Sequence, residues 1–98
     1  MAFIDEYDFS LLKNEAEFMV IREVENQLNS IDFEVCKCNE CIVDMVAIAL
    51  NTVKPLYRFS LLGTLYASQA MTEESYAGNI RDAVAMAIKK VKNNPAHN

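Results

Sequence analysis

The sequence predicts a mostly α-helical fold: one small domain with three main helices and one short extended segment. Two long stretches repeat apolar residues at a spacing near 3.6, the period of a helix with one buried face. A third stretch, residues 42–53, is apolar on nearly every side. The 98 residues include only two glycines and two prolines, too few for a turn-rich sandwich or long linkers. A chain of this length forms a single domain, here residues 1–98.

The first periodic stretch predicts a helix that begins after Ser10, a good N-cap residue, and ends near position 30. Phe18 and Ile21 lie outside its main apolar stripe, which suggests a wider buried surface such as a dimer contact. Residues 1–10 before it predict an irregular arm whose aromatic side chains lie on the domain or on a neighbour. The stripe consists of Leu12, Ala16, Met19, Val20, Val24 and Leu28.

Residues 42–53 predict a central helix, with Asn39 as its N-cap and Glu40 in its first turn. A helix without a polar face is normally surrounded by protein. Because so short a chain has few elements to cover it, we expect a second copy to complete its burial. Asp44 is the exception in this run, and a buried carboxylate needs a partner. Pro55 ends the helix, since the residue before a proline is pushed out of the α region.

The remaining segments are shorter or more regular. Residues 31–35 alternate apolar and acidic residues and predict an extended linker, with a very short strand as the alternative. Residues 57–59 predict a short extended piece. The last helix is expected after a cap at Thr72 or Ser75, with lysines near its C-terminus where the helix dipole favours cations. Its apolar stripe consists of Ile80, Val84, Ala87, Ile88 and Val91.

The charge distribution limits the classes of partner. The net charge is −5, and eleven of the fourteen acidic residues precede Leu50 whereas six of the nine basic residues follow it. An acidic domain disfavours binding to duplex nucleic acid, although the C-terminal half can still hold a small anion. No apolar run approaches a membrane span, and the acidic N-terminus is unlike a signal peptide. We therefore expect a cytoplasmic protein with no membrane partner.

Three cysteines within six positions are the strongest chemical signal. Cys38 and Cys41 have the spacing of a zinc knuckle, and Cys36 adds a third sulfur. The fourth ligand is open: Asp44 is the nearest candidate, and His97 can reach only if the tail folds back. Water or a thiolate from another chain also fits. The alternatives are inert buried cysteines, and a redox pair, which normally needs a βαβ setting that this helical pattern lacks.

Signs of catalysis are weak. The chain has no glycine-rich phosphate loop, and its single histidine makes a nucleophile–base pair implausible, so we expect no enzymatic activity. Arg58 follows Tyr57 after the proline break, and Arg81 lies near the start of the last helix. Arginines and helix N-termini bind phosphate, and a guanidinium plane stacks on a purine. The plain alternative is that both are ordinary surface arginines.

One spaced string resembles a known family. Cys36-x-Cys38-x-x-Cys41-x-x-Asp44, then Ala47-x-x-Leu50-Asn51, then Pro55-x-Tyr57 is similar to the late competence protein ComFB family, over about residues 12–66.

The resemblance implies a small helical bacterial protein that forms a symmetric homodimer and binds zinc. It also implies a receptor for a cyclic dinucleotide, chiefly c-di-GMP with c-di-AMP as the other candidate, linked to competence or pilus-based motility. By position, Asn51, Pro55 and Tyr57 inherit the motif that shapes the exit from the central helix. The alternative is a zinc-stabilised dimeric adaptor without a small ligand. The expected metal ligands are Cys36, Cys38 and Cys41, and the expected ligand-binding residues are Arg58, Arg81, Tyr57 and Asn51.

Overall fold

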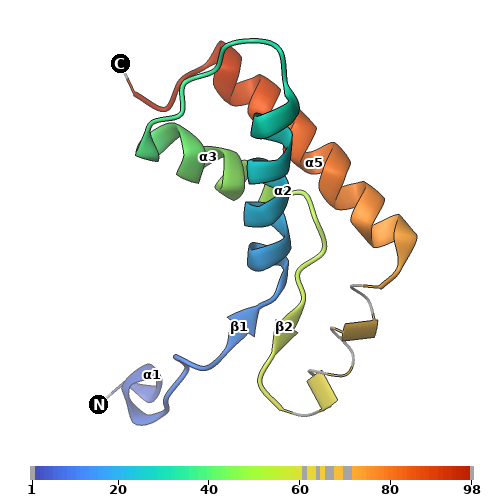
Figure 1. Cartoon of the computed structure of the whole chain (residues 1–98). Coiled ribbons are helices and arrows are strands. Elements are labelled where there is room, and N and C mark those ends of the chain that lie inside the picture. The colour runs from blue at the N-terminus through green and yellow to red at the C-terminus, as the bar shows by residue number, and fades with distance from the viewer. Residues whose placement is uncertain (1, 61, 64, 66–67, 70–71, 98) are drawn as a thin grey trace.

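Three helices form the body of the molecule, as the sequence predicts. The computed structural model describes residues 2–60, 62–63, 65, 68–69 and 72–97. Helices α2 (Ala16–Ser30), α3 (Asn39–Leu50) and α5 (Glu74–Asn93) pack against one another in pairs (Figure 1). No helix in the described part of the chain is long and apolar enough to cross a membrane.

The predicted apolar stripes form the core. Ala16, Val20 and Val24 of α2 face inward, and Cys41, Met45 and Ala49 of α3 are completely buried. These positions recur every four residues, so they lie on one side of each helix. On α5 the buried positions are Tyr76, Ile80, Val84, Ala87, Ile88 and Val91.

Helix α2 begins later than the sequence predicted. Ser10 does not cap it; its backbone N–H and hydroxyl instead donate to the Asp8 carboxylate at 2.9 and 2.6 Å. Leu12, which was expected in the stripe, is 47% exposed. Glu15 occupies the N-cap position without a side-chain hydrogen bond of its own, and the side-chain oxygen of Asn14, one residue earlier, accepts from the backbone N–H of Ala16 at 3.1 Å. The polar side chain that contacts the first turn of α2 is therefore Asn14 and not Ser10.

Helix α3 also begins with a different cap. Cys38, not Asn39, occupies the N-cap, and its sulfur accepts from the backbone N–H of Cys41 at 3.5 Å. The helix ends at Leu50, three residues before the predicted end. Its burial within one copy is incomplete, since Val43 is 56% exposed and Ala47 is exposed.

The segment after α3 returns to the start of α2. Strand β2 (Tyr57–Arg58) pairs antiparallel with β1 (Lys13–Asn14) in a two-stranded sheet. The predicted extended piece at 57–59 is therefore found as β2, while residues 31–38 form a linker without a strand. Glu73 is the N-cap of α5, so neither Thr72 nor Ser75 caps it.

The N-terminal arm differs from its prediction. It contains a single helical turn, α1 (Phe3–Glu6), and the ring centroids of Phe3 and of Tyr7, the residue after this turn, lie 4.7 Å apart. The arm extends away from the helical body (Figure 1), and Phe3, Ile4, Tyr7 and Phe9 are all between 48% and 68% exposed. Within one copy these side chains do not cover the domain.

Candidate functional site

Four soft-metal donors meet at the N-terminal end of α3. The Sγ atoms of Cys36, Cys38 and Cys41 and a ring nitrogen of His97 all lie within 4.8 Å of one another. We call these residues the Cys3His cluster. Cys36 comes from the linker, Cys38 from the N-cap and Cys41 from the first turn of α3, so the local chain direction alone brings the three sulfurs together. His97 comes from the tail after α5.

The cluster corrects the order of candidates for the fourth ligand. Asp44, the nearest acid in the sequence, is not part of the cluster. It lies one helical turn after Cys41, half-buried on α3. His97 reaches the sulfurs because the tail folds back, and its Nε2 lies 3.1 Å from Cys36 Sγ. A thiolate from a second chain is not needed to complete four donors. Nearness in the sequence favoured Asp44, which was wrong. The ligand preference of zinc favours His97, since histidine is a common zinc ligand.

Hydrogen bonds and burial set the acidity of the thiols. The backbone N–H of Cys38, together with the neighbouring thiols, lowers the pKa of Cys36 below its ordinary value. The backbone N–H of Ala96 lowers the pKa of Cys41, but burial and the Cys36 and Cys38 side chains outweigh it and raise that pKa to about 11.

The donor set fits a zinc ion. Zinc prefers four tetrahedral ligands, with Zn–S near 2.3 Å and Zn–N near 2.0 Å, and three thiolates with one imidazole form a known structural combination. Since all four are protein groups, no position is left open for a substrate, as is usual for structural zinc sites. The arrangement can therefore hold a metal that stabilises the fold.

The expected ligand-binding residues lie elsewhere. Arg58 is half-buried on β2, where its guanidinium donates to the carboxylate of Glu15. Arg81 on α5 pairs with Glu74 at 3.0 Å, and both of these side chains are more than half exposed. The two arginines line different hollows along α2: Arg58 one of about 300 Å³ with Phe18, and Arg81 one of about 130 Å³.

The other two expected residues flank the exit from α3. Asn51 is exposed and forms the C-cap, where its backbone N–H donates to the carbonyl oxygens of Ala47 and Ile48 at 3.1 and 3.2 Å. Tyr57 on β2 is 57% exposed. One copy does not bring these two residues and both arginines together in one pocket among the cavities described.

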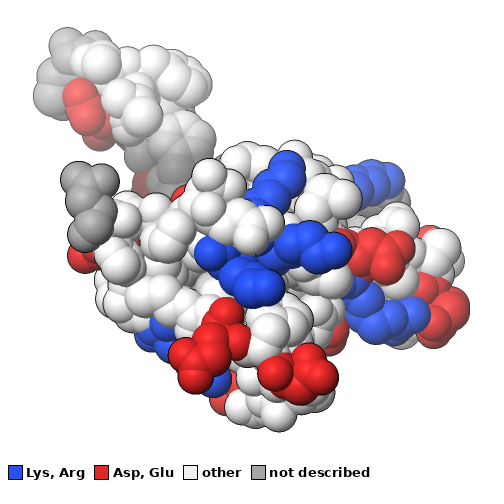
Figure 2. Space-filling view, turned by 90° about the horizontal axis from the view of Figure 1, so that it is seen from above, with Lys and Arg blue, Asp and Glu red and all other residues white. Residues whose placement is uncertain are grey.

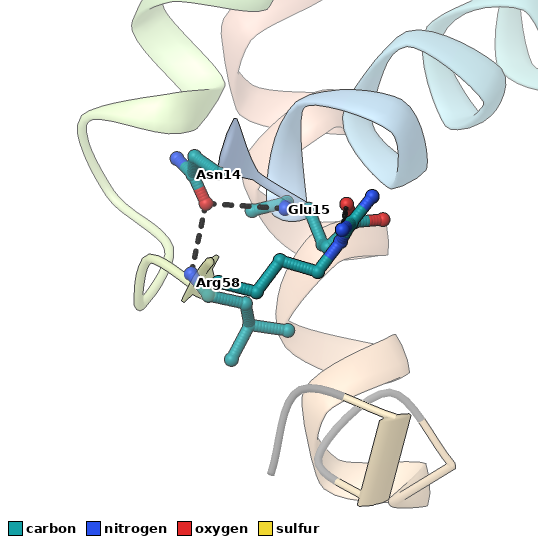
Figure 3. Close-up of polar contacts among 5 residues, drawn as sticks. Asn14, Glu15 and Arg58 are labelled. Atoms are coloured by element: carbon teal, nitrogen blue, oxygen red, sulfur yellow. Dashed lines mark hydrogen bonds and ion pairs between the residues drawn. The ribbon is translucent and has the colours of Figure 1, made fainter. Parts of the chain in front are cut away.

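Asn14, to which the sequence analysis assigned no role in a site, organises this exit. The side-chain oxygen of Asn14 accepts from the backbone N–H of Leu56 at 2.8 Å and from that of Ala16 (Figure 3). The backbone N–H of Glu15 donates to the Leu56 carbonyl at 2.8 Å. We call Asn14, Glu15, Leu56 and Arg58 the polar latch. An asparagine next to a helix start was the signal that could have revealed it.

Charge is unevenly spread over the surface. Lysine and arginine side chains gather on the face seen from above, where α5 ends (Figure 2). The last turn of α5 contributes Lys90 and Lys92 to this end of the molecule. On the same side, the Lys92 ammonium lies over the Phe33 ring at 4.7 Å from its centroid and joins α5 to the linker before α3.

Comparison with known proteins agrees with this architecture. The family model described as late competence development protein ComFB matches residues 13–95. Among solved structures, one titled as the late competence protein ComFB from Bacillus subtilis matches with a TM-score of 0.66 and 20% identity, covering 86% of this chain and 93% of the other. No curated protein sequence matches the chain. Because the family model spans most of the sequence, the chain belongs to the ComFB family.

Proposed function

We propose that the chain is a non-enzymatic, cytoplasmic signalling protein whose homodimer receives a cyclic dinucleotide, c-di-GMP or c-di-AMP, in a pathway linked to competence or pilus-based motility. The proposal rests on the ComFB family membership. The structural observation that supports it is the hollow beside β2, in which Arg58 and the largely exposed Phe18 lie together.

The chemistry of this hollow suits a nucleotide. An open aromatic ring stacks on a base, and an arginine binds phosphate through parallel hydrogen bonds. Lys13 adds a second cation, while Glu15 and Glu17 line the same hollow. A ligand phosphate must therefore compete with the Glu15 carboxylate for Arg58. A two-fold ligand suits a two-fold protein, because each copy supplies the same contacts.

Calorimetry with each cyclic dinucleotide, at protein concentrations on the order of tens of micromolar, tests the receptor proposal. We expect Arg58→Ala to weaken binding by about 10–100-fold, the range for losing charged hydrogen bonds. Glu15→Gln removes the competing carboxylate and should tighten binding. Arg81→Ala tests the second arginine. Lys90→Ala, at the end of α5, is the control that removes one positive charge away from the hollow. The receptor proposal fails if neither nucleotide gives heat, or if Arg58→Ala binds like the parent.

Exposed apolar surface supports the proposed dimer. Phe18 and Ile21 on α2 are 71% and 54% exposed, and Val43 on α3 is 56% exposed. Between the two helices runs a groove of about 360 Å³ with an apolar floor that includes Val24 and Val46. Exposed apolar patches of this kind commonly mark protein interfaces. Sedimentation should show two subunits for the parent and one for Ile21→Asp; a parent that sediments as a folded single subunit contradicts the dimer.

Zinc completes the proposal. Cys36, Cys38 and Cys41 would hold the ion together with His97, and its effect would be structural, since four protein donors leave no position open for a substrate. Native mass spectrometry of freshly purified protein reports subunit number, bound metal and retained nucleotide together. Zinc in the parent and its loss in Cys38→Ser support the site. A metal-free parent, still metal-free after addition of zinc, contradicts it.

The N-terminal arm favours a second candidate function, a zinc-stabilised dimeric adaptor without a small ligand. Its exposed aromatic residues alternate with Asp5, Glu6 and Asp8, a combination suited to binding another protein. A partner captured by the parent after nucleotide depletion, and lost when Phe3 and Tyr7 are both changed to serine, would favour the adaptor. Capture that requires added nucleotide would favour the receptor.

A further inference from the structure

The N-terminal arm, residues 3–9, has an apolar side and an acidic side. Phe3, Ile4 and Tyr7 lie on one side of the turn α1, because positions three and four apart share a face of a helix. All three side chains are more than half exposed. Spaced apolar anchors of this kind are the means by which a short helical segment enters a hydrophobic groove. The acidic residues of the arm are Asp5, Glu6 and Asp8.

The fold holds this arm away from its own helices. In the described part of the chain, the backbone hydrogen bonds of the arm stay within it: Asp5 donates to Ala2 at 3.0 Å and Leu12 to Phe9 at 3.1 Å. Strand β1 comes next and is fixed by its pairing with β2. This pairing places the arm beyond the start of α2, at the opposite end from the linker 31–38 (Figure 1). The apolar side of the arm therefore needs a surface on another molecule.

The groove between α2 and α3 offers such a surface. Its volume of about 360 Å³ is within the range of roughly 300–1,000 Å³ that holds a drug-sized ligand, so it can take one or two aromatic side chains. Its floor is continuous with the exposed Ile21 of the proposed dimer surface. The apolar residues that line it are Ile21, Val24, Leu28, Ile42 and Val46, and the polar ones are Glu25, Asn29 and Lys37.

Charge favours the same pairing. The arm carries three carboxylates and no lysine or arginine. Lys37 lines the groove from the linker before α3, and the Lys92 ammonium reaches the same linker, where it lies over the Phe33 ring. Glu25 is the one carboxylate among the groove residues and opposes the arm. Opposite charges at the edge of an apolar contact fix its register and orientation.

We propose that the arm of each copy packs into the α2–α3 groove of the other copy, so that two chains exchange arms. The exchange rests on the proposed homodimer and identifies the segment and the surface that form it. Each copy has one arm and one such groove. A two-fold pair therefore fills both grooves with both arms, and the assembly closes at two subunits. The Phe3 and Tyr7 rings enter the groove, and the carboxylates of the arm face Lys37.

The arms also supply apolar area that the helices lack. Stable interfaces bury about 1,200–2,000 Å² in total. The exposed apolar residues of the helical face, Phe18, Ile21 and Val43, form only a small patch. An aromatic side chain buries roughly 150–250 Å² when it is fully covered, and each arm has three aromatic residues. Two exchanged arms therefore contribute a large share of the area that a stable dimer needs.

Photochemical cross-linking of the full chain locates the arm. Benzoylphenylalanine replaces Tyr7 in one variant and Met86, an exposed residue on α5, in a control. We expect illumination of the Tyr7 variant to give a product with the mass of two chains, with the cross-link in residues 21–29 or 42–46 of the other chain. The Met86 variant should remain a single chain. A Tyr7 cross-link within one chain would mean that the arm covers its own groove, and would overturn the exchange.

Sedimentation measures the contribution of the arm to the dimer. Changing Phe3 and Tyr7 together to serine should raise the dimer dissociation constant on the order of 100-fold, as for central aromatic anchors of an interface. Glu25→Lys removes the opposing carboxylate and should lower that constant roughly 2–5-fold, the range of an exposed charge pair. Asp82→Lys makes the same charge change on the exposed surface of α5 and should have no effect.

The outcomes separate the exchange from the dimer itself. A parent that sediments as one subunit contradicts both. If the parent is a dimer, but the double serine variant dimerises equally well and Tyr7 forms no cross-link between chains, the exchange is wrong while the dimer stands. Equal tightening by Glu25→Lys and Asp82→Lys would assign the charge effect to the whole molecule and would contradict the groove as the binding surface.

Discussion

The two ends of α3 are fixed by different chemistry. At the N-terminal end, three thiols and one imidazole surround the first turn. At the C-terminal end, the chain leaves through Pro55 and the polar latch, in which Asn14 accepts from two backbone N–H groups. Thiols and an imidazole connect their chain segments strongly only when they bind a common metal ion. The latch connects its segments through neutral and charged hydrogen bonds and needs no ion. One end would therefore depend on the proposed metal, whereas the other is held by hydrogen bonds within the chain.

The comparison has a functional meaning. A connection that depends on metal or on the state of thiols can be altered without unfolding the rest of the domain. The latch instead keeps β2 and Arg58 in a fixed relation to α2, which is what a binding hollow requires. The proposed ligand surface thus lies beside the end held by the latch, and the proposed zinc site lies at the other end. Four experiments separate the two ends, taken here from the largest expected effect to the smallest.

Removing the metal should have the largest effect. A ligand present at about 1,000 times its Kd stabilises the folded state by roughly 4 kcal/mol, and a domain of this size then loses roughly 15–30 °C in Tm when the ligand is removed. Thermal unfolding followed by circular dichroism, with and without a chelator, measures this. Cys41→Ser should unfold at the same temperature in both conditions, and equal Tm values for the parent would contradict a stabilising metal.

Asn14→Ala should have the second largest effect, because it leaves two backbone N–H groups of the latch without an acceptor. We expect a loss of about 2 kcal/mol in the free energy of unfolding, within the range for unsatisfied buried donors. Urea unfolding measures it, with Asn14→Asp as the variant that keeps the acceptor oxygen. Zinc affinity should not change in either variant; a drop in that affinity would show that the two ends are coupled.

Tyr76→Phe tests another bond at the same end. The buried Tyr76 hydroxyl donates to the Lys54 carbonyl oxygen at 2.7 Å just before Pro55. Losing it should cost about 1 kcal/mol. Burial raises the pKa of Tyr76, with a smaller opposing effect from Lys54. The folded state thus binds the phenol proton more tightly than the unfolded state, so this contribution is complete below about pH 10 and declines above it.

The pH dependence of stability shows whether Tyr76 or other groups titrate when the protein loses stability at high pH. Urea unfolding of the parent between about pH 9 and 11 should show stability falling at the upper end of this range, and Tyr76→Phe should flatten that fall. The measurements use the metal-loaded protein, so that the thiols do not titrate in the same pH range. A parallel decline in the two proteins would assign the effect to other groups.

The Glu15–Arg58 ion pair should contribute least to stability. Its side chains are 21% and 39% exposed, so water screens their attraction. We expect Glu15→Gln to change the free energy of unfolding by about 0–1 kcal/mol, as for other accessible pairs. A comparison at low and high salt checks this, since the difference should shrink as salt rises. A loss above about 2 kcal/mol would mean that the pair is a main part of the latch.

Local patterns in the sequence determined the helical body and the cysteine site. Spacing near 3.6 placed the buried residues of α2 and α5, because a helix facing a core must repeat apolar residues once per turn. The three sulfurs are close in sequence and lie around one helix start, so their meeting needs no distant element. The family resemblance from Cys36 to Tyr57 could likewise be recognised from the sequence, because its residues are close together along the chain.

Contacts between distant segments were decided only by the tertiary structure. The choice of Asn14 over Ser10 depends on Leu56, whose backbone N–H shares the same acceptor from 42 positions away. Likewise, the choice of His97 over Asp44 depends on where the turn after α5 directs the tail. Periodicity and spacing describe neighbours along the chain, whereas a cap or a fourth ligand is selected by which group the packed helices bring within bonding distance.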